Sequence, residues 1–67
     1  MWVKNVFDII EKFFYGNYEN IYLIDISSRE TYYAADCTVG FLKSIPVGEI
    51  DGILTDDCDS KIYIKFN

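Results

Sequence analysis

The residues with the clearest capacity for chemistry are carboxylates gathered in one short stretch of the chain. Residues 49–59 hold five of the eleven acidic residues and neither Lys nor Arg; the five are Glu49, Asp51, Asp56, Asp57 and Asp59. Elsewhere acidic and basic residues are equal in number, so this segment carries the whole formal charge of −5. A patch of concentrated negative charge attracts cationic surfaces and repels phosphate backbones. The segment therefore predicts a binding surface for a basic partner.

Other groups that could act in catalysis lack the partners that catalysis requires. The chain has no His, the usual general base near neutral pH. Ser27 and Ser28 are not set in a nucleophile elbow, and acidic neighbours disfavour the thiolate forms of Cys37 and Cys58. The acidic segment does not match an EF-hand, and a domain this small has little room for a cleft. The sequence thus predicts no enzymatic activity, no cofactor, no metal, and two reduced thiols without a functional role.

Composition also limits the kinds of partner. Six basic residues against eleven acidic ones argue against direct binding to nucleic acid, although Lys61, Tyr63 and Lys65 form a small basic and aromatic strip. The sequence shows no signal peptide and no apolar run of about 18 residues, the length needed to cross a bilayer. We therefore expect a cytoplasmic protein whose partner is another protein, with no direct contact to nucleic acid or membrane.

Apolar residues recur at helical spacing near the start of the chain. They are Val3, Val6, Phe7, Ile10, Phe13 and Phe14. This stripe predicts an amphipathic helix over residues 3–15, which Gly16 and Asn17 end. No capping residue precedes the stripe, so its first turn is expected to fray. The side chains expected to dock on a sheet are Val6, Phe7, Ile10 and Phe13.

Four segments have the β-branched and aromatic composition of strands, namely residues 21–26, 31–35, 50–55 and 61–66. Two polar loops join them in pairs as hairpins. Between the hairpins, Val39, Leu42 and Ile45 are spaced for one short helical turn. The sequence predicts a single α+β domain over residues 1–67, with the N-terminal helix packed in two layers on a four-stranded antiparallel sheet. The expected order is helix, strand, strand, short turn, strand, strand.

One function that fits these features is inhibition of another protein. Side chains of like facing recur about every 6–7 Å along a strand, so the acidic hairpin can present its carboxylates in a row. In size, acidity and lack of catalytic motifs the whole chain resembles the small phage-encoded anti-defence proteins, the anti-CRISPR and anti-restriction inhibitors. Some proteins of that class mimic nucleic acid. The resemblance implies an inhibitor that contacts a basic surface, for example that of a nucleic-acid-handling enzyme.

The tyrosines indicate an alternative. Alternation along the strands cannot place all of Tyr22, Tyr32, Tyr33 and Tyr63 in a small core, and exposed tyrosines are typical of interfaces as well as of an open sheet face. The chain would then be an assembly module, a homodimer or a subunit of a larger complex, joined through the sheet face around Leu23, Ile53 and Tyr63. The acidic hairpin would only provide solubility. Docking through Tyr63 and its neighbours also fits an inhibitor, so both interpretations stay open.

Overall fold

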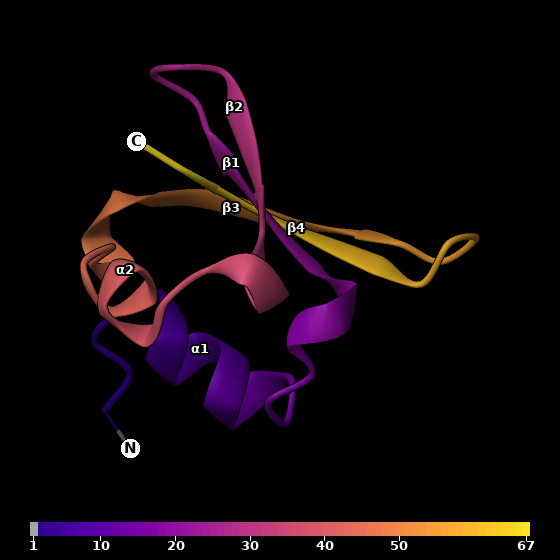
Figure 1. Cartoon of the computed structure of the whole chain (residues 1–67), viewed down its shortest axis with the longest axis horizontal. Helices are drawn as coiled ribbons and strands as arrows, with labels where there is room; N and C mark the ends of the chain where they lie inside the picture. The colour runs from indigo at the N-terminus through magenta and orange to yellow at the C-terminus, as the bar shows by residue number, and fades with distance from the viewer. Residues whose placement is uncertain (1) are drawn as a thin grey trace.

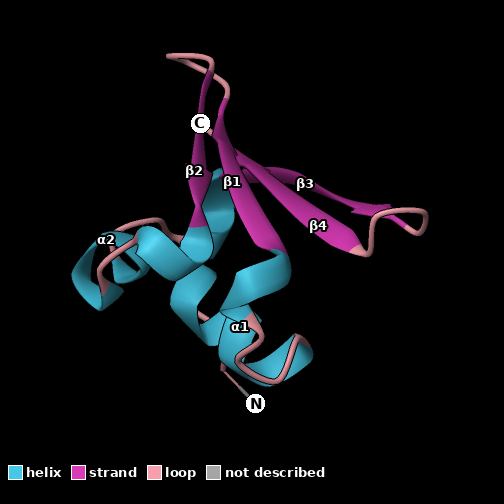
Figure 2. Cartoon of the chain, turned by 45° about the vertical axis from the view of Figure 1, so that its right-hand side comes forward, coloured by secondary structure: helices cyan, strands magenta, loops and turns pink. Residues whose placement is uncertain are grey.

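A sheet with its helices on one face forms this fold, of which the computed structural model describes residues 2–67 (Figure 1). The described helices are α1 (Val6–Phe13) and α2 (Val39–Lys43), and the strands are β1 (Ile21–Asp25), β2 (Glu30–Tyr33), β3 (Ile50–Asp56) and β4 (Lys61–Phe66). The 3₁₀ turns η1 (Tyr18–Asn20), η2 (Ala34–Asp36) and η3 (Val47–Glu49) connect them. Helices and strands occupy two layers (Figure 2). The predicted α+β class is confirmed.

The four-stranded sheet is mixed, so the prediction of a purely antiparallel sheet is wrong. Its order is β2-β1-β4-β3, and the two hairpins, β1–β2 and β3–β4, are antiparallel as predicted. The central strands β1 and β4 run parallel, with Ile21 opposite Ile62 and Asp25 opposite Phe66. Residues 34–49, which contain α2, carry the chain back along the sheet before β3 begins. A crossover of that length allows the second hairpin to join the first in parallel.

Helix α1 is shorter than the apolar stripe because a cap sets its start. The Asn5 side chain accepts a hydrogen bond from the Asp8 backbone N–H (2.9 Å), and the Asp8 carboxylate accepts one from the Lys4 backbone N–H (3.0 Å). This reciprocal arrangement resembles a capping box and fixes Val6 as the first helical residue. The prediction of an uncapped, fraying turn from residue 3 is therefore wrong. Gly16, with φ of 72°, follows the end of the helix as predicted.

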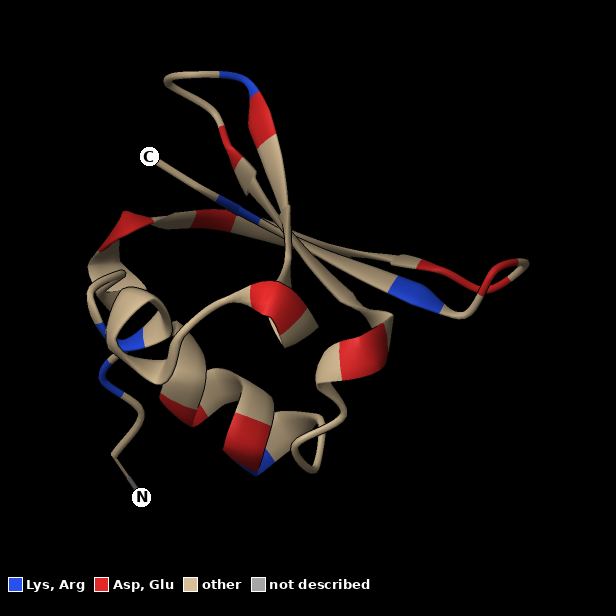
Figure 3. Ribbon diagram, viewed as in Figure 1, with Lys and Arg blue, Asp and Glu red and all other residues tan. Residues whose placement is uncertain are grey.

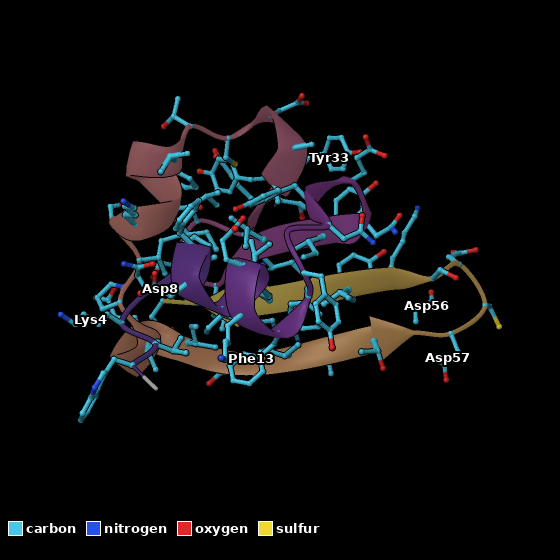
Figure 4. All side chains as sticks on the ribbon, turned by 90° about the horizontal axis from the view of Figure 1, so that it is seen from below. Lys4, Asp8, Phe13, Tyr33, Asp56 and Asp57 are labelled. Carbon is cyan, nitrogen blue, oxygen red and sulfur yellow. The ribbon has the colours of Figure 1, made fainter. Side chains whose placement is uncertain are left out.

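The core lies between the helices and the inner face of the sheet. Its buried members are Val6, Ile10, Ile21, Leu23, Ala34, Leu42, Ile45, Ile64 and Phe66. Phe7 packs against this core, but Phe13 is 52% exposed and does not dock as predicted. Figure 4 shows the Phe13 ring on the β3 side of α1, outside the core. Ile9 is buried instead, and α1 contacts α2.

Three further observations bear on what the sequence predicted. Leu23 is fully buried, so it cannot belong to an exposed sheet face as the sequence suggested. The short helical turn predicted around Leu42 is confirmed as α2, whose N-cap is Thr38. Among the described residues no helix is both long and apolar enough to cross a membrane.

Candidate functional site

The predicted acidic residues lie in two groups, one at each end of β3 (Figure 3). Glu49 belongs to η3, and Asp51 lies where the register of β3 against β4 shifts in a bulge. Asp56, Asp57 and Asp59 lie at the far end, around the tip of the β3–β4 hairpin. Residues 52–55 hold no acid, and at about 3.3 Å per residue they separate the two groups by about 16 Å. The carboxylates therefore form two anionic ends and no continuous row.

At the hairpin tip one carboxylate belongs to the turn. Asp56 Oδ1 accepts hydrogen bonds from the backbone N–H groups of Cys58 (3.0 Å) and Asp59 (3.3 Å). This is an Asx-type turn, and Ser60 completes it with φ of 57°. Asp56 is half-buried, whereas the Asp57 and Asp59 side chains are exposed. In Figure 4 the Asp57 carboxylate points away from the hairpin, so it is accessible to a partner.

The helix-free face of the sheet carries a row of three tyrosines, Tyr33 on β2, Tyr22 on β1 and Tyr63 on β4. They are cross-strand neighbours, because Tyr22 lies opposite both Tyr33 and Tyr63 in the strand register. Ring centroids are 5.1 Å apart for Tyr22 and Tyr33 and 5.6 Å apart for Tyr22 and Tyr63. Leu54 of β3, opposite Tyr63, continues this tyrosine row to the edge of the sheet.

The geometry of the tyrosine row suits protein contacts better than base stacking. The planes of neighbouring rings differ by only 27–28° at a spacing close to that of adjacent strands, so the rings stand face to face. The Lys61 ammonium lies 5.4 Å from the centroid of the Tyr22 ring, where it makes a cation–π contact. A nucleobase needs a free ring face on which to stack. The central Tyr22 ring has no free face, because Tyr33 and Tyr63 stack on its two sides.

One hydroxyl group of the tyrosine row is already engaged in a hydrogen bond within the chain. Tyr33 donates a hydrogen bond to the Glu19 backbone carbonyl at 2.8 Å, which ties β2 to η1. Desolvation raises the pKa of Tyr33, with smaller effects from Tyr22 and Glu19. The hydroxyl therefore stays protonated near neutral pH and acts as a donor rather than as a base.

A surface cleft of about 680 Å³ lies between α1, η1, η2 and α2, although the sequence indicated little room for one. Its polar lining includes Tyr18, whose hydroxyl donates a hydrogen bond to Glu11, and Cys37, whose thiol donates one to the Tyr33 carbonyl at 3.4 Å. Burial, and secondarily the Asp36 carboxylate, raises the pKa of the Cys37 thiol. Burial and the Glu11 contact likewise raise the pKa of Tyr18. The cleft thus presents no activated nucleophile.

The second thiol lies elsewhere. Cys58 is exposed at the hairpin tip, and both cysteines are free. In the described part of the chain no three His, Cys, Asp or Glu side chains are placed to hold a metal ion together. Comparison with family models, with curated proteins and with solved structures finds no match to this chain.

Proposed function

We propose that this chain is a non-enzymatic inhibitor that docks the tip of its β3–β4 hairpin on a basic surface of another protein. The observation that supports this function is the exposure of Asp57 and Asp59 beside a turn that already has its own aspartate, Asp56. The turn requires one acidic side chain, that of Asp56. The carboxylates of Asp57 and Asp59 add like-charge repulsion and accept no hydrogen bond from the turn. Binding to a cationic partner accounts for their presence.

The position of the hairpin supports the same function. Figure 1 shows the β3–β4 turn projecting away from the helical layer, and Figure 3 shows its tip as mainly acidic. A projecting acidic tip can enter a basic groove that the bulk of the molecule cannot enter. Proteins that handle nucleic acids have such grooves because they neutralise phosphates with Lys and Arg. A protein of that kind, blocked by contact at its basic groove, is the partner we infer.

The test is capture of a partner from a bacterial lysate on the immobilised protein, at low and at high salt. We expect a basic protein to be retained at low salt and lost when Asp57→Lys and Asp59→Lys are combined. The matched control reverses two exposed acids outside the hairpin, Glu19→Lys with Asp36→Lys, and is expected to retain the partner. Both variants change the net charge equally, so equal loss in the two would contradict recognition by the hairpin.

The tyrosine row supports a second function. Its three tyrosine side chains are only partly buried, and Leu54, which continues the row, is 50% exposed. Tyrosines gathered on an open face are typical of an interface, here one that joins this chain to a second copy or to a larger assembly. Sedimentation velocity at two protein concentrations tests self-association. A dimer that Tyr22→Ser and Tyr63→Ser abolish would favour this function over the first.

A further inference from the structure

The two edges of the sheet differ in how far they are open to another strand. β2, at one edge, has four residues and leads directly into η2, whereas β3, at the other edge, has seven residues. Among the described residues no hydrogen bond joins the outer side of β3 to another segment. An edge strand of this kind presents unpaired N–H and C=O groups, the template for adding a further strand. Its interior also lacks the Lys or Pro that commonly block such an edge.

The middle of β3 is apolar and exposed on both faces of the sheet. Ile53 lies opposite the buried Ile64, on the helix side, and is 41% exposed. Leu54 lies opposite Tyr63, on the helix-free side, and is 50% exposed. Each face of an added strand would therefore meet an apolar side chain of β3.

The charges at the two ends of β3 determine which strand can occupy the edge. Pairing β3 antiparallel with a second copy, centred on Ile53 and Leu54, would set Asp51 of one copy opposite Asp56 of the other. Like charges directly opposite one another destabilise a strand pair. This register, which would bring the apolar centres of the two copies together, is therefore disfavoured. A strand with an apolar centre and basic ends complements the edge, because Lys or Arg would then lie beside the acidic groups at both ends of β3.

We propose that β3 accepts an extended segment of a partner protein as a fifth strand, with apolar residues at its centre and Lys or Arg on both flanks. Because the flanking carboxylates include Asp57 at the hairpin tip, this docking mode rests on the proposed binding of a basic protein surface. Backbone hydrogen bonds to the edge would give affinity, and the charged flanks would select the segment and its register. The tyrosine row is not needed for this contact.

The probe is the synthetic peptide Lys-Lys-Thr-Val-Ile-Val-Thr-Lys-Lys, titrated against the intact chain at low ionic strength. One matched peptide is N-methylated at alternate central residues, which removes backbone donors and keeps every charge. A second matched peptide carries Ser in place of each Lys. Amide hydrogen exchange maps where the peptide binds. We expect the parent peptide to slow amide exchange in residues 52–56, and either matched peptide to bind about tenfold more weakly or worse.

The other outcomes separate this proposal from the function on which it rests. Equal binding of the parent and N-methylated peptides overturns strand addition but leaves the acidic hairpin as the recognition surface. Equal binding of the parent and Ser peptides overturns the choice of a basic segment and counts against the proposed function too. Protection confined to the tyrosine row, or no binding of the parent peptide, overturns docking at β3. A further result would also overturn it. If the chain without peptide formed a dimer in sedimentation equilibrium, and its β3 amides were protected from exchange, a second copy would occupy the edge.

Discussion

The two hairpins of this protein are closed by the same turn and differ in what surrounds it. In the β1–β2 hairpin Asp25 Oδ1 accepts hydrogen bonds from the N–H groups of Ser27 (3.0 Å) and Ser28 (3.4 Å). In the β3–β4 hairpin Asp56 does the same for Cys58 and Asp59. Each loop then ends on a residue with positive φ, Arg29 (62°) or Ser60 (57°), one position before the next strand begins. The turn therefore explains one aspartate in each hairpin.

The turn does not explain the additional negative charge at the tip of the β3–β4 hairpin. The β1–β2 loop adds no acidic residue between its two strands, whereas the β3–β4 loop adds Asp57 and Asp59. Each hairpin pairs a central strand with an edge strand, and the edge strands differ in length, four residues in β2 and seven in β3. Both hairpins contribute two buried residues to the core, Ile21 and Leu23 from β1 and Ile64 and Phe66 from β4. The β3–β4 hairpin differs in having a longer edge strand and an acidic tip. These differences place recognition at the β3–β4 hairpin, in keeping with the proposed function, while both central strands stabilise the core.

The largest expected effect is the difference in packing between the central strand β1 and the edge strand β3. Leu23→Ala, in β1, should lower the free energy of unfolding by about 2–5 kcal/mol, because it empties a fully buried site. Leu54→Ala, in β3, should cost less than about 1 kcal/mol, because that side chain is already half exposed. Urea unfolding of the two variants measures both values. Similar losses would show that β3 belongs to the core as fully as β1.

A smaller effect tests whether the turns are equivalent. Asp25→Ala and Asp56→Ala should each lower the free energy of unfolding by about 0.5–1.5 kcal/mol, since each removes an acceptor for two backbone N–H groups. Asp57→Ala should change it by no more than about 0.5 kcal/mol, as expected for a surface side chain away from such contacts. Thermal melts of the three variants rank them. If Asp57→Ala destabilised as much as Asp56→Ala, Asp57 would have a structural role.

The smallest effect concerns the residues with positive φ. Arg29→Gly and Ser60→Gly should each stabilise the fold by about 0.5 kcal/mol, because Gly adopts this conformation without a steric cost. The gain should be the same in both hairpins if the two turns share one conformation. Denaturant midpoints of the single variants and of the double variant check this. If only one of the two substitutions stabilised the fold, the two turns would not share one conformation.

Much of the fold is predictable from local sequence patterns. β4 spans the predicted residues, 61–66, because Ile62, Ile64 and Phe66 alternate with polar and aromatic neighbours. The pairing of the hairpins is a long-range feature, so no local pattern indicates that β1 and β4 run parallel. The start of α1 was missed because its cap, Asn5, lies inside the apolar stripe rather than before it.

The candidate site was predictable in part. The sequence places Asp57 and Asp59 in a turn, but it does not show that the Asp56 carboxylate bonds back to that turn. The tyrosine row depends on the register between three strands, although Tyr22, between the buried Ile21 and Leu23, gives a local signal for the open face. The exposed edge of β3 follows from the sheet order and could not be read from the strand itself.

The most direct test of the central claim is the association rate of the captured partner at increasing ionic strength. Asp57→Lys with Asp59→Lys should slow association by about tenfold or more at low salt, with the difference shrinking as salt screens the field. The Glu19→Lys and Asp36→Lys control should associate at close to the parent rate. If the hairpin variant associated as fast as the parent at low ionic strength, the acidic tip would not be the recognition surface.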